Sequence, residues 1–185
     1  AFAALGHLDC KNNSLSSLNI SNNINLENVY TDNNSLSSLN VSNNTDLIQI
    51  YCSNNNINNL DVSLNVNLRG LYCENNNLST LNVATNTDLT ELYCGFNNLT
   101  SLDVSTNVSL TNLAFSSNSI SSINLSFNTD LITLDSGSNS LTELTVTNNT
   151  ALETLLCSYN NLGVLDISTN TVLQHLYVQE AALTD

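Results

Sequence analysis

Residues 47–67, LIQIYCSNNNINNLDVSLNVN, are followed directly by residues 68–88, LRGLYCENNNLSTLNVATNTD, and the two segments share most of their apolar and asparagine positions. The pattern recurs along the whole chain with a period of 21 residues. A fixed period in this range is typical of a solenoid, in which stacked units bury one another's apolar side. One inward position shows the period in nine successive units: Leu8, Val29, Ile50, Leu71, Leu92, Leu113, Leu134, Leu155 and Leu176.

The unit reads L-x-C-x-x-N-x-L-x-x-L-x-V-S-x-N-x-x-L-x-x. Eight full units cover residues 8–175, an incomplete ninth covers 176–185, and residues 1–7 are the end of a preceding unit or a partial cap. We therefore expect one domain over residues 1–185. Solenoids need specialised ends, and neither end here has one, so we expect flanking domains of the same chain or a capping partner.

The first part of the unit matches the L-x-x-L-x-L-x-x-N-x-L signature, and the chain resembles the leucine-rich-repeat family over essentially its full length. A second, shorter copy of the signature is nested half a unit later, over residues 57–65. This nesting is similar to that of the short bacterial subclass called IRREKO repeats. In one unit the signature is carried by Leu47, Ile50, Cys52, Asn55 and Ile57.

In both halves of the unit, apolar residues alternate with outward-facing ones, which is the pattern of a short strand. We therefore predict a mainly β leucine-rich-repeat solenoid of about eight coils, with two short parallel strands per coil. The few residues between the half-units are too few for a typical helix of about 11 residues, so we expect no helices. The coils should stack about 4.8 Å apart, with a sheet on each of two sides.

The charge of the chain argues against polyanionic partners. The net charge is -14, and Lys11 and Arg69 are the two basic residues of the sequence. Nucleic-acid binding needs many lysines and arginines to replace the counterions of the phosphates, so we expect no nucleic-acid partner. No apolar run approaches the roughly 20 residues that span a bilayer, so we expect no membrane insertion.

Asparagine makes up roughly a fifth of the chain, far above average usage, and gathers in two columns. We expect these side chains to pair backbone groups at tight bends, to tolerate left-handed backbone and to bond along the stack. Glycosylation at Asn-x-Ser/Thr sequons is the alternative, although such sequons arise readily in a chain of this composition. The first column is Asn13, Asn34, Asn55, Asn76, Asn97, Asn118, Asn139 and Asn160, and the second is Asn23, Asn44, Asn65, Asn86, Asn107, Asn128, Asn149 and Asn170.

The cysteines and histidines are interpreted as non-catalytic. The five cysteines share one column with Phe115, which indicates a core position. Stacked positions lie about 4.8 Å apart, farther than the roughly 3.8 Å between Cβ atoms in a disulfide, so buried free thiols are favoured over disulfides or a metal cluster. His7 and His175 lie at opposite ends of the stack and are expected to be solvated. The cysteine column contains Cys10, Cys52, Cys73, Cys94 and Cys157.

Carboxylates form partial columns, which we interpret as a charged, solubilising surface. Calcium held by neighbours such as Asp9 and Asp32 is the alternative. Members of the first column recur every second coil, roughly 9.6 Å apart, too far to share an ion that needs ligands at about 2.4 Å. We therefore expect no metal and no other cofactor. The two columns are Asp46, Asp88 and Asp130, and Asp61, Asp103 and Asp166.

The strongest functional signal is the outward column that follows the strand leucine, in which four successive coils carry tyrosine. Tyrosine has a large rigid face and a polar tip, which suit protein recognition and stacking on sugar rings. The alternative is that stacked tyrosines only stabilise neighbouring strands. The candidate ligand-binding residues are Tyr30, Tyr51, Tyr72, Tyr93, Tyr177, Glu74 and Glu91.

These features indicate a non-enzymatic module that binds a protein or a glycan through its tyrosine-bearing sheet, because a repeating rod offers no pocket in which acid, base and nucleophile converge. The resemblance and the acidity point to an extracellular or bacterial cell-surface location. The alternative is a passive spacer in a larger surface protein or secreted assembly. An array that binds ice or a crystalline polymer is disfavoured, because the outward threonines are irregular and interrupted by aspartate.

Overall fold

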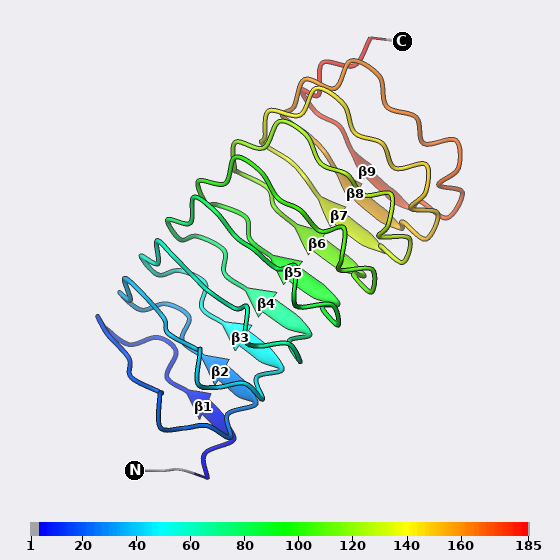
Figure 1. Ribbon diagram of the computed structural model, residues 1–185. Helices are drawn as coiled ribbons and strands as arrows, with labels where there is room; N and C mark the ends of the chain where they lie inside the picture. Colours follow the sequence, from blue (N-terminus) through cyan, green and yellow to red (C-terminus); the bar gives the residue numbers. More distant parts are fainter. Residues whose placement is uncertain (1–3, 185) are drawn as a thin grey trace.

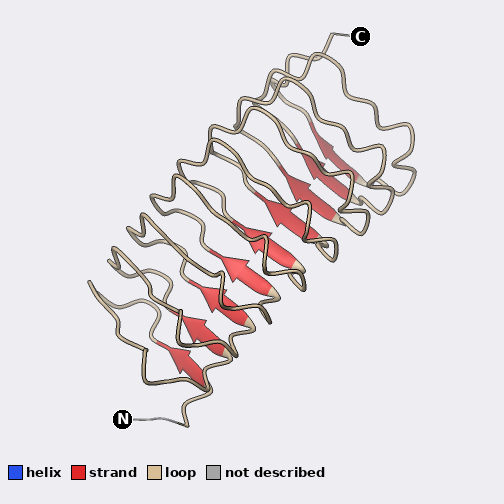
Figure 2. Ribbon diagram, in the orientation of Figure 1, coloured by secondary structure: helices blue, strands red, loops and turns tan. Residues whose placement is uncertain are grey.

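The computed structural model describes residues 4–184, which form one continuous stack of coils with the two ends of the chain at opposite ends of the stack (Figure 1). Each coil carries one three-residue strand, and all the strands lie along one side of the stack (Figure 2). The strands are β1 (His7–Asp9), β2 (Asn28–Tyr30), β3 (Gln49–Tyr51), β4 (Gly70–Tyr72), β5 (Glu91–Tyr93), β6 (Asn112–Ala114), β7 (Thr133–Asp135), β8 (Thr154–Leu156) and β9 (His175–Tyr177).

The strands form a single nine-stranded parallel sheet in sequence order, β1 to β9. Each strand pairs with the next at equivalent positions of the repeat; for example, Ile50 lies opposite Leu71 and Tyr51 opposite Tyr72. The 21-residue period is therefore the length of one coil. The predicted solenoid of 21-residue coils is confirmed, and no helix occurs within residues 4–184.

The prediction of a second strand in each coil is wrong: within the described residues, the return segment of each coil contains no strand. The alternation identified the burial correctly, since Ile57 and Val62 are buried and Asp61 is exposed. The hydrogen bonding differs, however. The Ile57 N–H donates to Oδ1 of Asn76 at 2.9 Å, so a side chain takes a donor that a strand would offer to its neighbour.

The core runs through the middle of the stack and is built from the inward positions of every coil. In the fourth coil Leu71, Leu78, Val83 and Leu89 are fully buried. Each coil places its apolar side chains against those of the coils above and below, which is why a single coil could not fold alone.

The first asparagine column ties successive coils together, as predicted. Nδ2 of Asn97 donates to the carbonyls of Cys73 and Cys94 at 3.0 and 3.1 Å, and also to that of Gly95. Its Oδ1 accepts the N–H of Leu78 at 2.9 Å. Because two of these partners belong to the preceding coil, one amide closes its own turn and joins two coils.

The buried asparagines of the second column use only half of each amide. Nδ2 of Asn86 donates to the carbonyls of Val62 and Asn65 at 3.1 and 2.8 Å. Among the described residues, Oδ1 of this asparagine and of its buried equivalents has no hydrogen-bond partner. Those with an unpaired Oδ1 are Asn44, Asn65, Asn86, Asn107, Asn128, Asn149 and Asn170.

The left-handed backbone lies one residue before the first asparagine column, not in the columns themselves. Asn54 and Asn75 have φ values of 57° and 51°. Later coils place bulkier residues at the same position, including Phe96 with φ of 52° and Tyr159 with φ of 57°. Side chains other than glycine, asparagine and aspartate are disfavoured in this region, so these two positions carry backbone strain.

All five cysteines are free, and all but the half-buried Cys10 are buried, which confirms the prediction of buried thiols. Burial raises the pKa of Cys94 to about 12 and that of Cys157 to about 11. A thiol is reactive as its thiolate, so these cysteines serve the core as small apolar side chains.

Candidate binding face

Four predicted tyrosines, one from each of β2 to β5, form a stack that we call the tyrosine ladder: Tyr30, Tyr51, Tyr72 and Tyr93. Their successive ring centroids lie 4.6, 4.1 and 5.0 Å apart, with interplanar angles of 12°, 8° and 7°. The in-register parallel pairing explains this geometry, because it repeats an outward position at the strand spacing of about 4.8 Å.

The ladder is half-buried, and its rings cover one another. Both faces of the Tyr51 and Tyr72 rings contact a neighbouring ring. A sugar ring therefore cannot stack on these two residues while the ladder is intact. Their ring edges and hydroxyl groups remain on the outer side of the sheet.

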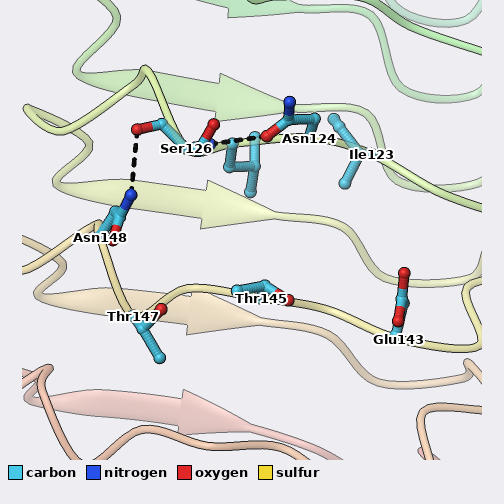
Figure 3. Close-up of a pocket in the computed structure, with 8 residues that line it drawn as sticks. Ile123, Asn124, Ser126, Glu143, Thr145, Thr147 and Asn148 are labelled. Carbon is cyan, nitrogen blue, oxygen red and sulfur yellow. Dashed lines mark hydrogen bonds between the residues drawn. The ribbon is translucent and has the colours of Figure 1, made fainter.

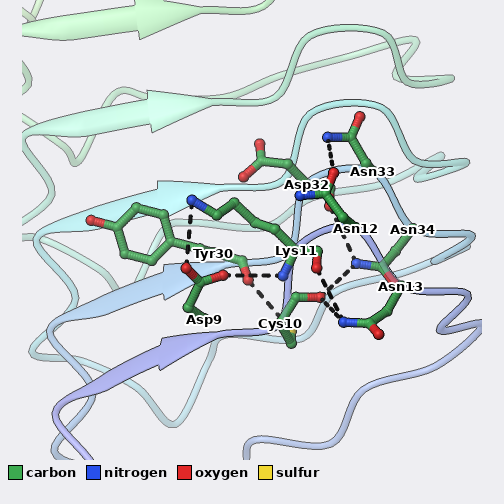
Figure 4. A network of polar contacts seen from close by, with 9 residues as sticks. All are labelled: Asp9, Cys10, Lys11, Asn12, Asn13, Tyr30, Asp32, Asn33 and Asn34. Carbon is green, nitrogen blue, oxygen red and sulfur yellow. Dashed lines mark hydrogen bonds and ion pairs between the residues drawn. The ribbon is translucent and has the colours of Figure 1, made fainter.

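The amino-terminal end of the ladder is covered by a cation. Lys11 Nζ lies 4.9 Å from the centroid of the Tyr30 ring and 3.5 Å from Oδ2 of Asp9 (Figure 4). Oδ1 of the same carboxylate accepts the backbone N–H of Lys11 at 3.1 Å. His7 also lies against Tyr30, with ring centroids 4.9 Å apart and tilted by 42°. The carboxylate thus holds a cation over the first ring.

The other end of the ladder is formed differently, because Ala114 follows Tyr93 in the column. Asn112 Nδ2 donates to the hydroxyl oxygen of Tyr93 at 3.1 Å and fixes the tip of the ring. One coil further on, Asp135 occupies the column, and its Oδ2 accepts the hydroxyl of Ser116 at 2.8 Å. Beyond the last tyrosine, the column therefore contains a small alanine side chain and then a carboxylate.

Two predicted carboxylates lie beside the ladder. Glu91 accepts a hydrogen bond from the hydroxyl of Tyr72. Glu74 Oε2 accepts the hydroxyl of Ser53 at 3.0 Å, and burial raises the pKa of the Glu74 carboxyl. These groups give the face a negative charge. The remaining candidate, Tyr177 on β9, is 55% exposed and lies apart from the ladder.

Sequence reasoning missed the residues at the ends of the ladder. Lys11 and His7 contact Tyr30, although His7 was expected only to be solvated; it is exposed, as is His175. Asp135 was visible in the tyrosine column of the sequence. The sequence alone does not show that the rings stack along the axis of the solenoid, and therefore does not show that Asp135 lies beyond the last ring, that of Tyr93.

The return side of the coils has a surface pocket lined by eight residues, including Asn124, Ser126, Glu143, Thr145 and Asn148 (Figure 3). Asn148 Nδ2 donates to the carbonyl of Ser126 at 3.3 Å, and the Ser126 N–H donates to Oδ1 of Asn124 at 3.0 Å. Glu143 is the one ionisable residue of the eight. The lining therefore lacks a paired acid and base.

Aspartates on the return side have local roles. Oδ1 of Asp103 accepts the Ser105 N–H at 2.9 Å, and this hydrogen bond lowers the pKa of the carboxyl, as the Ser63 N–H does for Asp61. Hydrogen bonds from the Ser168 side chain and N–H lower the pKa of Asp166. Across residues 4–184, no group of three or more histidine, cysteine, aspartate or glutamate residues is arranged to hold a metal ion. The described part of the chain also contains no helix able to cross a membrane.

One short parallel strand per 21-residue coil, followed by an asparagine-lined turn, defines a leucine-rich-repeat solenoid, and the chain is a protein of this class. The functional domain of InlJ from Listeria monocytogenes, which includes a cysteine ladder, superposes with a TM-score of 0.88. It is 31% identical over 98% of this chain and 45% of that one.

Two further structures support the assignment. The internalin InlF from Listeria monocytogenes gives a TM-score of 0.83 and 27% identity over 94% of this chain and 54% of that one. YopM from Yersinia enterocolitica gives 0.82 and 29% over 98% of this chain and 39% of that one. The chain thus spans about half the length, or less, of these three neighbours. No protein-family model matches it, and no curated sequence is significantly similar.

Proposed function

We propose that the chain is a non-catalytic, protein-binding module and that its partner docks on the face of the nine-stranded sheet that carries the tyrosine ladder. The main observation in support of this proposal is that the tyrosine side chains of the ladder are held in fixed positions. Its rings are fixed by stacking, and Asn112 and Glu91 hold two of its hydroxyl groups. Rigid aromatic groups lose little conformational entropy on binding, which makes them effective contact residues.

A protein partner fits this face better than a glycan. The usual aromatic contact with a sugar uses the open face of a ring, and the inner rings of the ladder have both faces covered. Their exposed edges and hydroxyls instead suit hydrogen bonds and edge contacts with a protein surface. The solenoid provides such contacts over an extended length.

We further propose that the module acts outside the cell, at a bacterial surface or in a secreted protein. The net charge of -14 and the likeness to leucine-rich-repeat proteins of Listeria and Yersinia support this location. The face itself carries Glu74, Glu91 and Asp135. A basic protein surface is therefore the expected partner, because its charge is complementary.

The second candidate function is a passive spacer, and the stacking itself favours it. Rings that pack on one another stabilise neighbouring coils whether or not a ligand binds. In this case the ladder would contribute to stability, and its outer edges would contact only solvent.

A binding screen distinguishes the two functions. The purified protein would be tested by surface plasmon resonance against arrays of secreted and surface proteins and against glycan arrays. We expect saturable binding to one or a few basic proteins. Binding to glycans alone would contradict the protein-binding proposal, and a complete absence of binding would favour the spacer.

A further inference from the structure

The two ends of the tyrosine ladder have related chemistry. At the amino-terminal end, Asp9 occupies the tyrosine column, and Lys11 lies over the neighbouring ring of Tyr30. At the other end, Asp135 occupies the same column two coils beyond Tyr93. Both carboxylates accept the backbone N–H two residues further on, at 3.1 Å for Asp9 and 3.0 Å for Asp135. The aspartate is thus held by the same local turn at each end.

The two ends of the ladder differ because only the amino-terminal end has a lysine over its outer ring. The residue that contributes the N–H is lysine in the first coil and Gly137 in the seventh, so Asp135 has no lysine on its own turn. Arg69, the other basic residue of the chain, lines a surface pocket with Glu27, Asp46 and Asp88. No lysine or arginine of the chain therefore remains for the Tyr93 end of the ladder.

We propose that this end of the ladder binds an arginine side chain of the protein partner, with its guanidinium group over the ring of Tyr93, above Ala114, and paired with the carboxylate of Asp135. The proposal rests on the proposed function, because it takes the sheet face as the docking surface. It identifies the partner chemistry: a basic protein that presents an arginine in the place that Lys11 occupies at the other end.

The spacing accommodates the arginine. Tyr93 and Asp135 lie two coils apart, or about 9.6 Å at the usual strand spacing. A cation within about 6 Å of a ring centroid gains a favourable cation–π interaction, and a guanidinium group over Ala114 lies between the coil that carries the ring and the coil that carries the carboxylate. The intervening Ala114 has the smallest side chain of the column from Tyr30 to Tyr177.

The polar groups at this end are already ordered. The two oxygens of Asp135 accept one hydrogen bond each, from Ser116 and from Gly137, and an ionised carboxylate has roughly four acceptor sites. About two sites therefore remain for a guanidinium donor. Arginine fits better than lysine, because its planar group stacks on an aromatic face while its N–H groups bind a carboxylate.

Nuclear magnetic resonance can test the site without the natural partner. The protein, labelled with ¹³C in its tyrosine rings, would be titrated with the blocked peptide acetyl-Gly-Arg-Gly-amide and with the same peptide carrying citrulline, the neutral isostere of arginine. We expect the arginine peptide to shift the ring signals of Tyr93 saturably, and more than those of Tyr51, and the citrulline peptide to have little effect.

Three variants make the test specific. Asp135→Asn removes the charge while keeping the shape, and Ala114→Leu fills the space over the ring. Asp103→Asn is the matched control, because Asp103 accepts the N–H two residues on in the same way but lies on the return side. We expect Asp135→Asn to weaken binding by about threefold or more, Ala114→Leu to abolish it and Asp103→Asn to leave it unchanged.

The proposal is overturned if the Tyr93 signals do not respond, or if the two Asp→Asn variants weaken the response equally. That second result would indicate a general attraction of the peptide to an acidic protein. If a partner found in the screen still docks on the sheet face while the peptide titration is negative, the arginine site is wrong and the protein-binding function stands. If a range of proteins fails to bind this face at all, the proposed function itself fails.

Discussion

Replacing Asn97 by alanine should remove the set of polar contacts by which a buried asparagine of the first column joins two coils. Asn97 is 8% exposed and bonds the N–H of Leu78, together with the carbonyls of Cys73, Cys94 and Gly95. Alanine provides none of these interactions. It would leave a buried N–H in the preceding coil and several carbonyls without their side-chain donor.

The expected cost follows from the groups that lose their partner. An unpaired buried donor costs about 1–3 kcal/mol, and the two N–H groups of the amide together contribute about 2 kcal/mol net through their carbonyl hydrogen bonds. Asn97→Ala should therefore lower the free energy of unfolding by about 3–5 kcal/mol. Asn98→Ala is the matched control: Asn98 is exposed, and its backbone N–H, which alanine retains, donates to the carbonyl of Leu78. It should change stability by less than about 0.5 kcal/mol.

Urea denaturation followed by far-ultraviolet circular dichroism would measure both variants against the unmodified protein. The two free energies of unfolding should differ by several kcal/mol. If both variants unfold at the same urea concentration as the unmodified protein, the asparagine column does not join the coils, and the reasoning from its hydrogen bonds is refuted.

Three further outcomes are expected. Tyr51→Leu removes two stacking contacts and should lower the free energy of unfolding in urea by about 1–3 kcal/mol, whereas Tyr177→Leu, in an exposed side chain, should have little effect; equal losses would contradict a stabilising ladder. Phe96→Asn should raise the free energy of unfolding by about 0.5–1 kcal/mol, because asparagine tolerates the left-handed backbone at this position better than phenylalanine does. Phe127 is an exposed phenylalanine elsewhere, and a similar gain from Phe127→Asn would refute that cause. Burial raises the folded-state pKa of Glu74, so its stabilising contribution is present at acidic pH and lost as pH rises through that pKa. Glu74→Gln should therefore raise the Tm at pH 7 but not below the ordinary pKa of glutamate, and an equal effect at both pH values would contradict this linkage.

The period and the core of the solenoid could be predicted because both depend on side-chain polarity. The inward positions of Leu71, Cys73, Leu78 and Val83 recur in every full unit, and these four residues are fully buried. Alternation specifies which side of the backbone faces the core. It does not specify whether the backbone N–H groups pair with a neighbouring strand, which is why the return segment was assigned a strand that the structure lacks.

The tyrosine column was identified from the sequence, but its function depends on ring orientation. The outward direction of the tyrosine side chains suggested that the faces of their rings would be open to a ligand. The strand spacing instead brings the rings of Tyr51 and Tyr72 into contact, which covers those faces. The ends of the ladder were missed for a related reason. Lys11 lies over the first ring of the stack and Asp135 lies beyond the last ring, and a single column of the sequence does not show where stacking begins and ends.

Two lysine substitutions test whether the sheet face is the binding surface. Thr133 lies on β7 in that face, and Thr145 lies on the return side among the residues of the pocket in Figure 3. Surface plasmon resonance would measure the affinity of each variant for the protein identified by the screen. We predict that Thr133→Lys weakens binding by about tenfold or more, a loss of about 1.4 kcal/mol, while Thr145→Lys binds like the unmodified protein. Loss of binding in Thr145→Lys with normal binding by Thr133→Lys would show that the partner does not dock on the sheet face.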